Sequence, residues 1–510
     1  MMSGQELAAS DFDSDAYNIS LPGSGRRGTF SRLTDLFLPL LLLAIFPFLI
    51  YPFDFMKPYG PIPLRIFLTL CIFTPLFLFR KSAWVIIPII FYMATQALWR
   101  RALIPWMGVV RTDPLLLIGA TLSILYFLEV ALSRKLKFNT TTAKLRLALI
   151  IIMVLEIFNP KQGGVTVGLG GVFFILIPVL WSFAGRELGN EKAMPAFLWT
   201  IVLIGMAGAL YGLKQTFYGL SSFETLWLNS QNTQSFYTAN GTVRTFSFFT
   251  AGSEYGIFLV VAIVTAVALA VRCRQPIALL SLPLLGTALF YTSERTPVVM
   301  ALFGIVLVWA VQGKTVASWV PRLILASLIG VSGLVYGLRH AQSDAVGSSQ
   351  DSLIQHQAQG LLDPAHSSAA IHAGAVQMGI IGGIKSIVGG GLGITTLAGA
   401  KWGNGNANSE NDISNMFISL GWGGFLYIAF IISAMGLAFR IWLQTRSVTG
   451  IFGIAILSVC LGGWLNGDNY SIVMLCWLVI GMLERQNDLL IAARQKAAAS
   501  GNPAYLQAGS

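Results

Sequence analysis

Three arginines at the ends of apolar segments, Arg244, Arg295 and Arg339, have the chemistry needed to bind a phosphate. A guanidinium group keeps its charge at physiological pH and offers paired N–H donors. It can therefore hold a pyrophosphate and stabilise the negative charge that develops when the pyrophosphate leaves. We take these arginines as the candidate pyrophosphate ligands.

A structural explanation competes with this one, because arginines at helix ends often extend toward the membrane surface. It is strong for Arg295, since the following Thr296 and Pro297 are typical of a helix cap and a first helical residue. It is weaker for Arg244, which lies in a polar segment several residues before the next apolar run.

All four histidines of the chain fall within residues 339–412. A histidine with a pKa of about 6.5 can accept a proton from a hydroxyl group. Apolar residues recur at roughly helical spacing from 368 to 384, which predicts a short helix at the membrane interface that carries His372. His372 is the first candidate for a general base, although a solvated interfacial histidine explains any one of the four equally well. A metal site is not expected, because His366 and His372 do not share a helix face and no cysteine is near.

Acidic residues at the starts of apolar runs are further candidates. Glu410 is the second candidate base. Glu254 lies just inside an apolar run, where burying an acid is costly without a partner, so we expect Arg244 or Arg295 to pair with it in a substrate site. Asp412 follows Ser409 by three residues, and a capping role at a helix start is the favoured explanation for it.

Composition defines the elements that must position these residues. Of the 510 residues, 55% are hydrophobic and only 11% are charged, and the mean hydropathy is +0.70. Soluble domains carry about 25% charged residues, so this composition excludes a soluble enzyme, a disordered chain and a coiled coil. The net charge of +11 comes from short basic clusters between apolar runs, which is typical of membrane topology signals and not of nucleic-acid binding.

Apolar runs long enough for membrane helices recur along the whole chain, because about 20 apolar residues cross a bilayer as an α-helix. They fall near 36–53, 64–79, 83–99, 114–132, 145–158, 165–184, 196–213, 251–271, 276–292, 297–312, 322–338, 413–439, 450–465 and 470–483. Since several are short, the sequence predicts an all-α polytopic membrane protein with about 12–14 transmembrane helices.

Most lysines and arginines fall on one side if both termini are cytoplasmic, although Arg100 and Arg101 then lie on the opposite side. The predicted organisation is a cytoplasmic tail expected to be disordered (1–34), transmembrane helices with an external loop at 214–250 (35–338), a long extracytoplasmic loop with short interfacial helices (339–412), C-terminal transmembrane helices (413–485) and a cytoplasmic tail (486–510).

Several segments, in order, resemble the O-antigen ligase and polymerase superfamily of bacterial envelope polysaccharide assembly. They are Ile-Phe-Asn-Pro at 157–160, Arg-Thr-Phe-Ser-Phe-Phe at 244–249, Ser-Glu-Arg at 293–295, the glycine-rich 389–393 and the stretch from Asn408 to Gly424. The resemblance covers roughly residues 145–485. Taken alone, 389–393 is only a weak phosphate loop, because no strand precedes it and no Lys-Ser/Thr follows it.

This resemblance implies a metal-independent, cofactor-free, inverting glycosyltransferase in the bacterial inner membrane. Its donor is a glycan linked to undecaprenyl pyrophosphate, its active site is extracytoplasmic, and its partners are membrane lipid and other polysaccharide assembly proteins such as a chain-length regulator. Family arginines thought to engage the pyrophosphate correspond to Arg244 and Arg295, and the long-loop position corresponds to His372. Polymerase is preferred over ligase.

Two other classes of function remain open at this point. A transporter or flippase of lipid-linked glycans usually shows inverted repeats and ionisable sites near mid-membrane. Acids within the apolar runs are few, Glu129 and Glu156 being the clearest, so chemistry in the outer loops is favoured over passage. A non-catalytic assembly subunit is the third reading.

Overall fold

The computed structural model describes residues 62–499 except 111–112, 134–135, 137, 232–235, 238–242, 314, 345–357, 359–360, 363–368, 405–406, 410 and 466–468. Apart from an isolated bridge between Tyr237 and Val243, the regular structure of these residues is helical. The helices are α2 (Ile62–Leu78), η2 (Ala83–Val85), α3 (Ile86–Ala102), α4 (Ile104–Met107), η3 (Pro114–Leu116), α5 (Leu117–Leu132), α6 (Thr141–Glu156), η4 (Pro160–Gln162), α7 (Val165–Gly171), η5 (Val172–Leu176), α8 (Ile177–Leu188), α9 (Met194–Tyr218), α10 (Ser222–Gln231), α11 (Gly252–Arg272), η7 (Pro276–Ser281), α12 (Leu282–Tyr291), α13 (Arg295–Ala310), α14 (Val316–Asp344), α16 (Ala369–Ile384), α17 (Leu397–Trp402), α18 (Asp412–Leu420), α19 (Gly423–Thr445), α20 (Val448–Val459) and α21 (Tyr470–Ala499).

Within this part of the chain, seven helical segments are long and apolar enough to cross a membrane, and five apolar helices are shorter. Each predicted apolar run from residue 64 onward coincides with one or more helices, whereas the run at 36–53 lies outside the described residues. The prediction of an all-helical, polytopic membrane protein is thus confirmed. The total of 12–14 spans stays a prediction.

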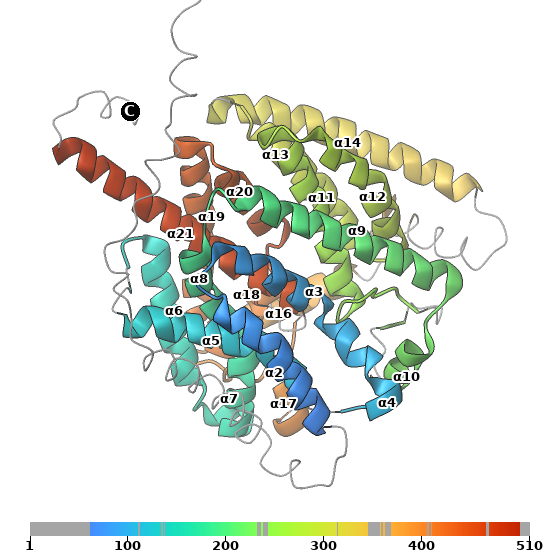
Figure 1. The fold of residues 1–510 in the computed structure, drawn as a ribbon, viewed down its shortest axis with the longest axis vertical. Coiled ribbons are helices and arrows are strands. Elements are labelled where there is room, and N and C mark those ends of the chain that lie inside the picture. Colours follow the sequence, from blue (N-terminus) through green and yellow to red (C-terminus); the bar gives the residue numbers. More distant parts are fainter. Residues whose placement is uncertain are drawn as a thin grey trace, which may run out of the picture.

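Helix α11 is the most buried of the candidate membrane spans, whereas α14 lies at the margin of the molecule (Figure 1). In the apolar window of α11 83% of the residues are buried, against 6% in α14. Small residues let the inner helices approach closely, as Gly205 of α9 does opposite Ala262 of α11. The apolar surface of α14 is compatible with lipid, because hydrocarbon accepts apolar side chains as readily as a protein core does.

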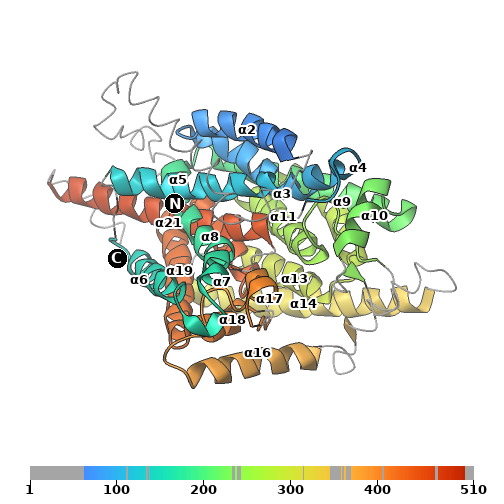
Figure 2. The same cartoon turned by 90° about the horizontal axis from the view of Figure 1, so that it is seen from below.

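The described part of the long segment predicted as an external loop contains helices. A helix, α16, occupies Ala369–Ile384 as the sequence spacing predicts, and it packs against α18 at the edge of the molecule (Figure 2). The apolar run at 413–439 is not one helix, because it breaks between α18 and α19 at Gly421, whose φ of 59° suits glycine. Whether α16 lies at a membrane interface stays a prediction.

The glycine-rich segment 389–393 is a packing element. Its five backbone N–H groups donate to Glu156 Oε1, Ile418 O, Ser419 O, Glu156 O and Gln162 Oε1, in chain order. A side chain at Gly393 would lie 2.0 Å from the carbonyl oxygen of Val167, so the absent Cβ is what permits this contact. All five donors are occupied by the protein, so an anion has no free N–H group to bind here.

Arginines bind helix C-termini at the opposite end of α11 from Arg244. Arg446 donates to the carbonyl oxygens of Val311 and Gly313, both at 3.1 Å, at the end of α13. Arg485 donates to two carbonyls in the last turn of α8, both at 2.8 Å. A cation is favourable at this position, because the last carbonyls of a helix lack partners and carry partial negative charge.

Candidate functional site

Arg244 lies in the segment that leads into α11, and its guanidinium group reaches the end of another segment. Its Nη1 is 3.1 Å from Oε1 of Glu294, the residue that precedes Arg295. The side chains of Arg244 and Glu294 are 33% and 21% exposed, so the pair is accessible to a ligand. The structure therefore brings together two sequence segments that carry predicted arginines.

The turn before α13 differs from the sequence prediction. Helix α13 begins at Arg295 with Glu294 in the cap position, and no side chain caps it. The expected cap at Thr296 is wrong, because the cap position falls two residues earlier, directly after Ser293, which has a φ of 60°. As a result Arg295 is the first helical residue, and its side chain is partly exposed.

The ion pair between Arg244 and Glu294 lies against the first turns of α11. A Cβ at Gly252 would lie 3.8 Å from both Cβ of Arg244 and Oε1 of Glu294, and one at Gly256 would lie 3.8 Å from Cβ of Glu294. The ion pair therefore packs on the N-terminal end of α11. The partial positive charge of a helix N-terminus adds to that of the arginines there.

The carboxylate of Glu254 contacts the start of α21. Its carboxylate is buried and accepts hydrogen bonds from Ser471 N at 2.8 Å, Ser471 Oγ at 2.6 Å and Thr250 N at 3.0 Å. Ser471 is the second residue of α21, whose first N–H groups lack partners within the helix. These hydrogen bonds make the carboxylate a cap for α21, so its partner is a helix start where the sequence suggested an arginine.

Asp412 also serves a neighbouring segment. Asn411 caps α18, and its side chain accepts from Ile413 N at 2.9 Å. The carboxylate of Asp412 instead accepts from Leu465 N at 2.5 Å. Burial raises the pKa of Asp412 to about 7, since a carboxylate away from water is costly when charged. The predicted location at a helix start is correct, but the capping side chain is Asn411.

The remaining predicted residues do not join this cluster in the part of the chain that is described. The backbone of His372 lies in α16, while its side chain and the whole of Glu410 lie outside the described residues. Arg339 lies near the end of α14 with an exposed side chain. The base therefore stays a sequence prediction.

Two arginines that the sequence placed on the unexpected side find partners within the protein. Arg101 is 1% exposed and donates through Nη2 to the carbonyl of Ser247 at 2.9 Å. Arg100 lies 3.4 Å from the carboxylate of Asp113, which also pairs with Arg65. The signal was present in the sequence, because a basic doublet on the side that lysine and arginine avoid needs a local reason.

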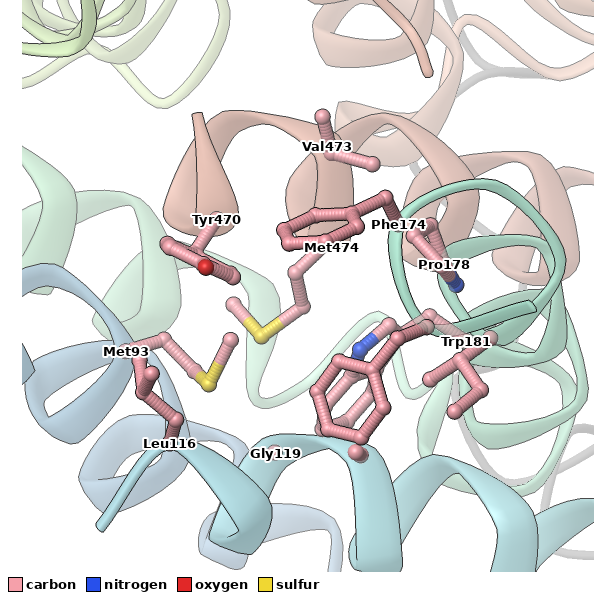
Figure 3. A pocket seen from close by; sticks show the side chains of 12 residues that line it. Met93, Leu116, Gly119, Phe174, Pro178, Trp181, Tyr470, Val473 and Met474 are labelled. Atoms are coloured by element: carbon pink, nitrogen blue, oxygen red, sulfur yellow. The ribbon is translucent and has the colours of Figure 1, made fainter. Parts of the chain in front are cut away.

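A small apolar pocket lies at the start of α21. Its walls come from α3, α5, η5, α8 and α21, and Met93 and Met474 reach into it from two helices (Figure 3). Phe173 and Phe174 line it from η5, a π-helical turn of the kind often found at functional sites. Tyr470, also in the wall, precedes the Ser471 that binds Glu254. The pocket and the ion pair thus flank the joined N-termini of α21 and α11.

Comparison with known proteins does not add a family assignment. A scan of protein-family models finds no match to this chain, and a search of curated proteins finds no similar sequence.

Proposed function

We propose that this chain is an integral-membrane glycosyltransferase of bacterial envelope polysaccharide assembly. It joins glycan repeat units carried on undecaprenyl pyrophosphate, and polymerisation is preferred over ligation to another acceptor. The observation that carries the proposal is the contact between Arg244 and Glu294 at 3.1 Å, which brings one predicted pyrophosphate ligand next to the segment of the other, Arg295.

The charge around the ion pair supports binding of a pyrophosphate. Arg244 and Arg295 supply two positive charges against the single negative charge of Glu294, and the N-termini of α11 and α13 add partial positive charge. Two guanidinium groups can bind both phosphates of the donor and stabilise the charge on the leaving group. The net positive charge is therefore of the right sign for this substrate.

The apolar pocket supports a lipid-linked substrate. Aromatic, aliphatic and methionine side chains form its wall, which suits a hydrocarbon chain and not a sugar. In the proposed arrangement the polyprenyl chain lies toward this pocket and the pyrophosphate toward Arg244. The glycan then extends away from the membrane.

The distribution of arginines supports an extracytoplasmic site. Arg272, at the C-terminal end of α11, Arg446 and Arg485 lie at the opposite end of the bundle from Arg244. Because positive residues favour the cytoplasmic side, we assign that end to the cytoplasm, with both chain termini there. The proposed enzyme has 12–14 transmembrane helices, lies in the inner membrane, and works beside a chain-length regulator.

The proposed reaction is an inverting substitution at the anomeric carbon of the donor. A hydroxyl oxygen of the acceptor forms a bond to that carbon while the bond from the carbon to the pyrophosphate oxygen breaks. Undecaprenyl pyrophosphate leaves with the bond's electron pair, bound by Arg244 and Arg295. The hydroxyl proton passes to His372 or Glu410.

Replacement of the arginines in cells tests the proposal. In Arg244→Ala and Arg295→Ala we expect loss of surface polymer and accumulation of lipid-linked repeat units. Arg440→Ala, at an exposed position near the end of α19, is the control and should leave polymer unchanged. Normal polymer length in the Arg244 variant would contradict the proposal.

A lipid-linked glycan flippase is the competing function. The broken segments expected at a transport site exist here, at 389–393 and Gly421, but the N–H groups of the glycine-rich segment are occupied by neighbouring segments. Elongation of lipid-linked glycan by the purified protein in detergent separates the two, since no membrane is then present to cross.

A further inference from the structure

We propose that Arg101 and Gln215 are positioning residues that hold the segment 244–250 and thereby place Arg244 for pyrophosphate binding. The inference rests on the proposed function for the role of Arg244. We call the contacts of Arg101 and Gln215 with residues 244–250 the clamp. These contacts lie within the protein and do not depend on the proposed activity.

Arg101 reaches this segment from the end of α3. Its Nη2 donates to the carbonyl oxygen of Ser247 at 2.9 Å, and the side chain is fully buried. The guanidinium carbon lies 5.0 Å from the ring centroid of Trp227 and 4.6 Å from that of Phe246. Contacts with two aromatic faces favour the flat guanidinium group over an ammonium group.

Gln215, near the end of α9, holds the same segment with both ends of its amide. Its Oε1 accepts from the backbone N–H groups of Phe246 at 3.2 Å and Ser247 at 2.8 Å. Its Nε2 donates to Ser247 O at 3.2 Å and to Glu224 Oε1 at 2.6 Å. Three backbone atoms of the segment therefore depend on this one side chain.

Ser247 has a backbone conformation that needs such support. Its φ is 51°, in the left-handed region that residues other than glycine seldom occupy. Its hydroxyl donates to the carbonyl of Gly208 at 2.7 Å, which ties the turn to α9. A strained turn persists only where its surroundings determine it, and here Arg101, Gln215 and Gly208 do so.

Burying the charged guanidinium group of Arg101 costs free energy. Nε and Nη1 of Arg101 have no hydrogen-bond partner. The buried Glu224 supplies a nearby negative charge, but it binds Gln215 at 2.6 Å and Tyr211 at 3.1 Å and also lies 3.9 Å from Nζ of Lys214. An arrangement with unused buried donors is not the most stable way to fill this space, so a role in positioning gives it a reason.

Amide hydrogen exchange of peptides covering 243–250 tests the clamp without reference to activity. In the purified full chain we expect Arg101→Lys and Gln215→Leu each to speed exchange in this segment at least tenfold. Arg440→Lys is the matched control and should change nothing. Gel filtration verifies that each variant is folded, and the two substitutions remove different bonds, so one remains informative if the other misfolds. Exchange within twofold of the wild type in a folded variant would overturn the clamp.

Binding of undecaprenyl pyrophosphate in detergent tests whether the clamp acts through Arg244. Arg101→Lys should weaken binding at least fivefold in the wild-type background and should have no further effect in Arg244→Ala. Equal weakening in both backgrounds would overturn positioning and indicate a general structural effect. If the wild-type protein does not bind this lipid, the proposed function fails, while the exchange result still decides the clamp.

Discussion

Oε1 of Glu294 lies 3.1 Å from Nη1 of Arg244, and Glu294 is bonded through the chain to Arg295. Glu294 therefore pairs with the side chain of one arginine of the candidate site and directly precedes the other in the chain. Both side chains of the pair are partly exposed, and such pairs contribute about 0–1 kcal/mol to stability. The pair thus matters more for what Arg244 can bind than for holding the fold.

Glu294→Gln should leave the fold intact and favour donor binding. The carboxylate competes with a pyrophosphate for Arg244, and glutamine removes that charge while keeping an acceptor oxygen. We expect a KM for the lipid-linked donor that is equal to or below that of the wild type, and a free energy of unfolding within about 1 kcal/mol of it. Steady-state kinetics and thermal unfolding measure the two. A tenfold rise in KM would instead make Glu294 itself a required ligand.

Two substitutions in the buried ion cluster at the other end of the bundle should lower the free energy of unfolding by different amounts. Glu484 lies 2.9 Å from Arg146 and 3.1 Å from Arg186, while Arg186 also pairs with Asp488. Glu484→Gln leaves the buried Arg146 without its counter-charge and should cost about 3–5 kcal/mol. Arg146→Met should cost less, because Glu484 keeps Arg186. Thermal unfolding of the two variants in one detergent checks the order, and the reverse order would refute it.

Gly393→Ala should destabilise the protein although it adds only a methyl group. The new Cβ would meet the carbonyl oxygen of Val167 at 2.0 Å, so the backbone must move. We expect a loss of about 1–3 kcal/mol, typical of overpacking. Gly436→Ala in α19 is the control, since no atom lies within 4 Å of its Cβ position. Equal melting temperatures for the two variants would contradict the close packing of 389–393.

The raised pKa of Asp412 predicts that the stability of the protein depends on pH. Its pKa is about 7 in the folded protein, because of burial, against about 3.9 in an unfolded chain. A raised pKa means that this group stabilises the fold fully below about pH 4 and loses that contribution as pH rises through 7. The melting temperature of Asp412→Asn should therefore rise relative to that of the wild type between pH 5 and pH 8. A difference that stays constant over this range would show that Asp412 does not titrate there.

The sequence by itself determined the class of the protein and most of its helices. Apolar runs predicted the helices from 64 onward because a helix in hydrocarbon satisfies every backbone group internally and needs little help from its neighbours. Helix α16 was also predictable, because its apolar residues recur at roughly helical spacing within one short segment. Residue type and order along the chain also make Arg244 and Arg295 candidate ligands for the same pyrophosphate.

Only the tertiary structure decided which partner each polar group has. It assigned Glu254 to Ser471, Asp412 to Leu465, Arg101 to Ser247, and the N–H groups of 389–393 to Glu156, Gln162 and their neighbours. These contacts join residues far apart in the chain, and the apolar pattern that predicts a helix contains no information on which helix ends will meet. A polar group buried in a membrane protein must find a partner, but the fold selects which one.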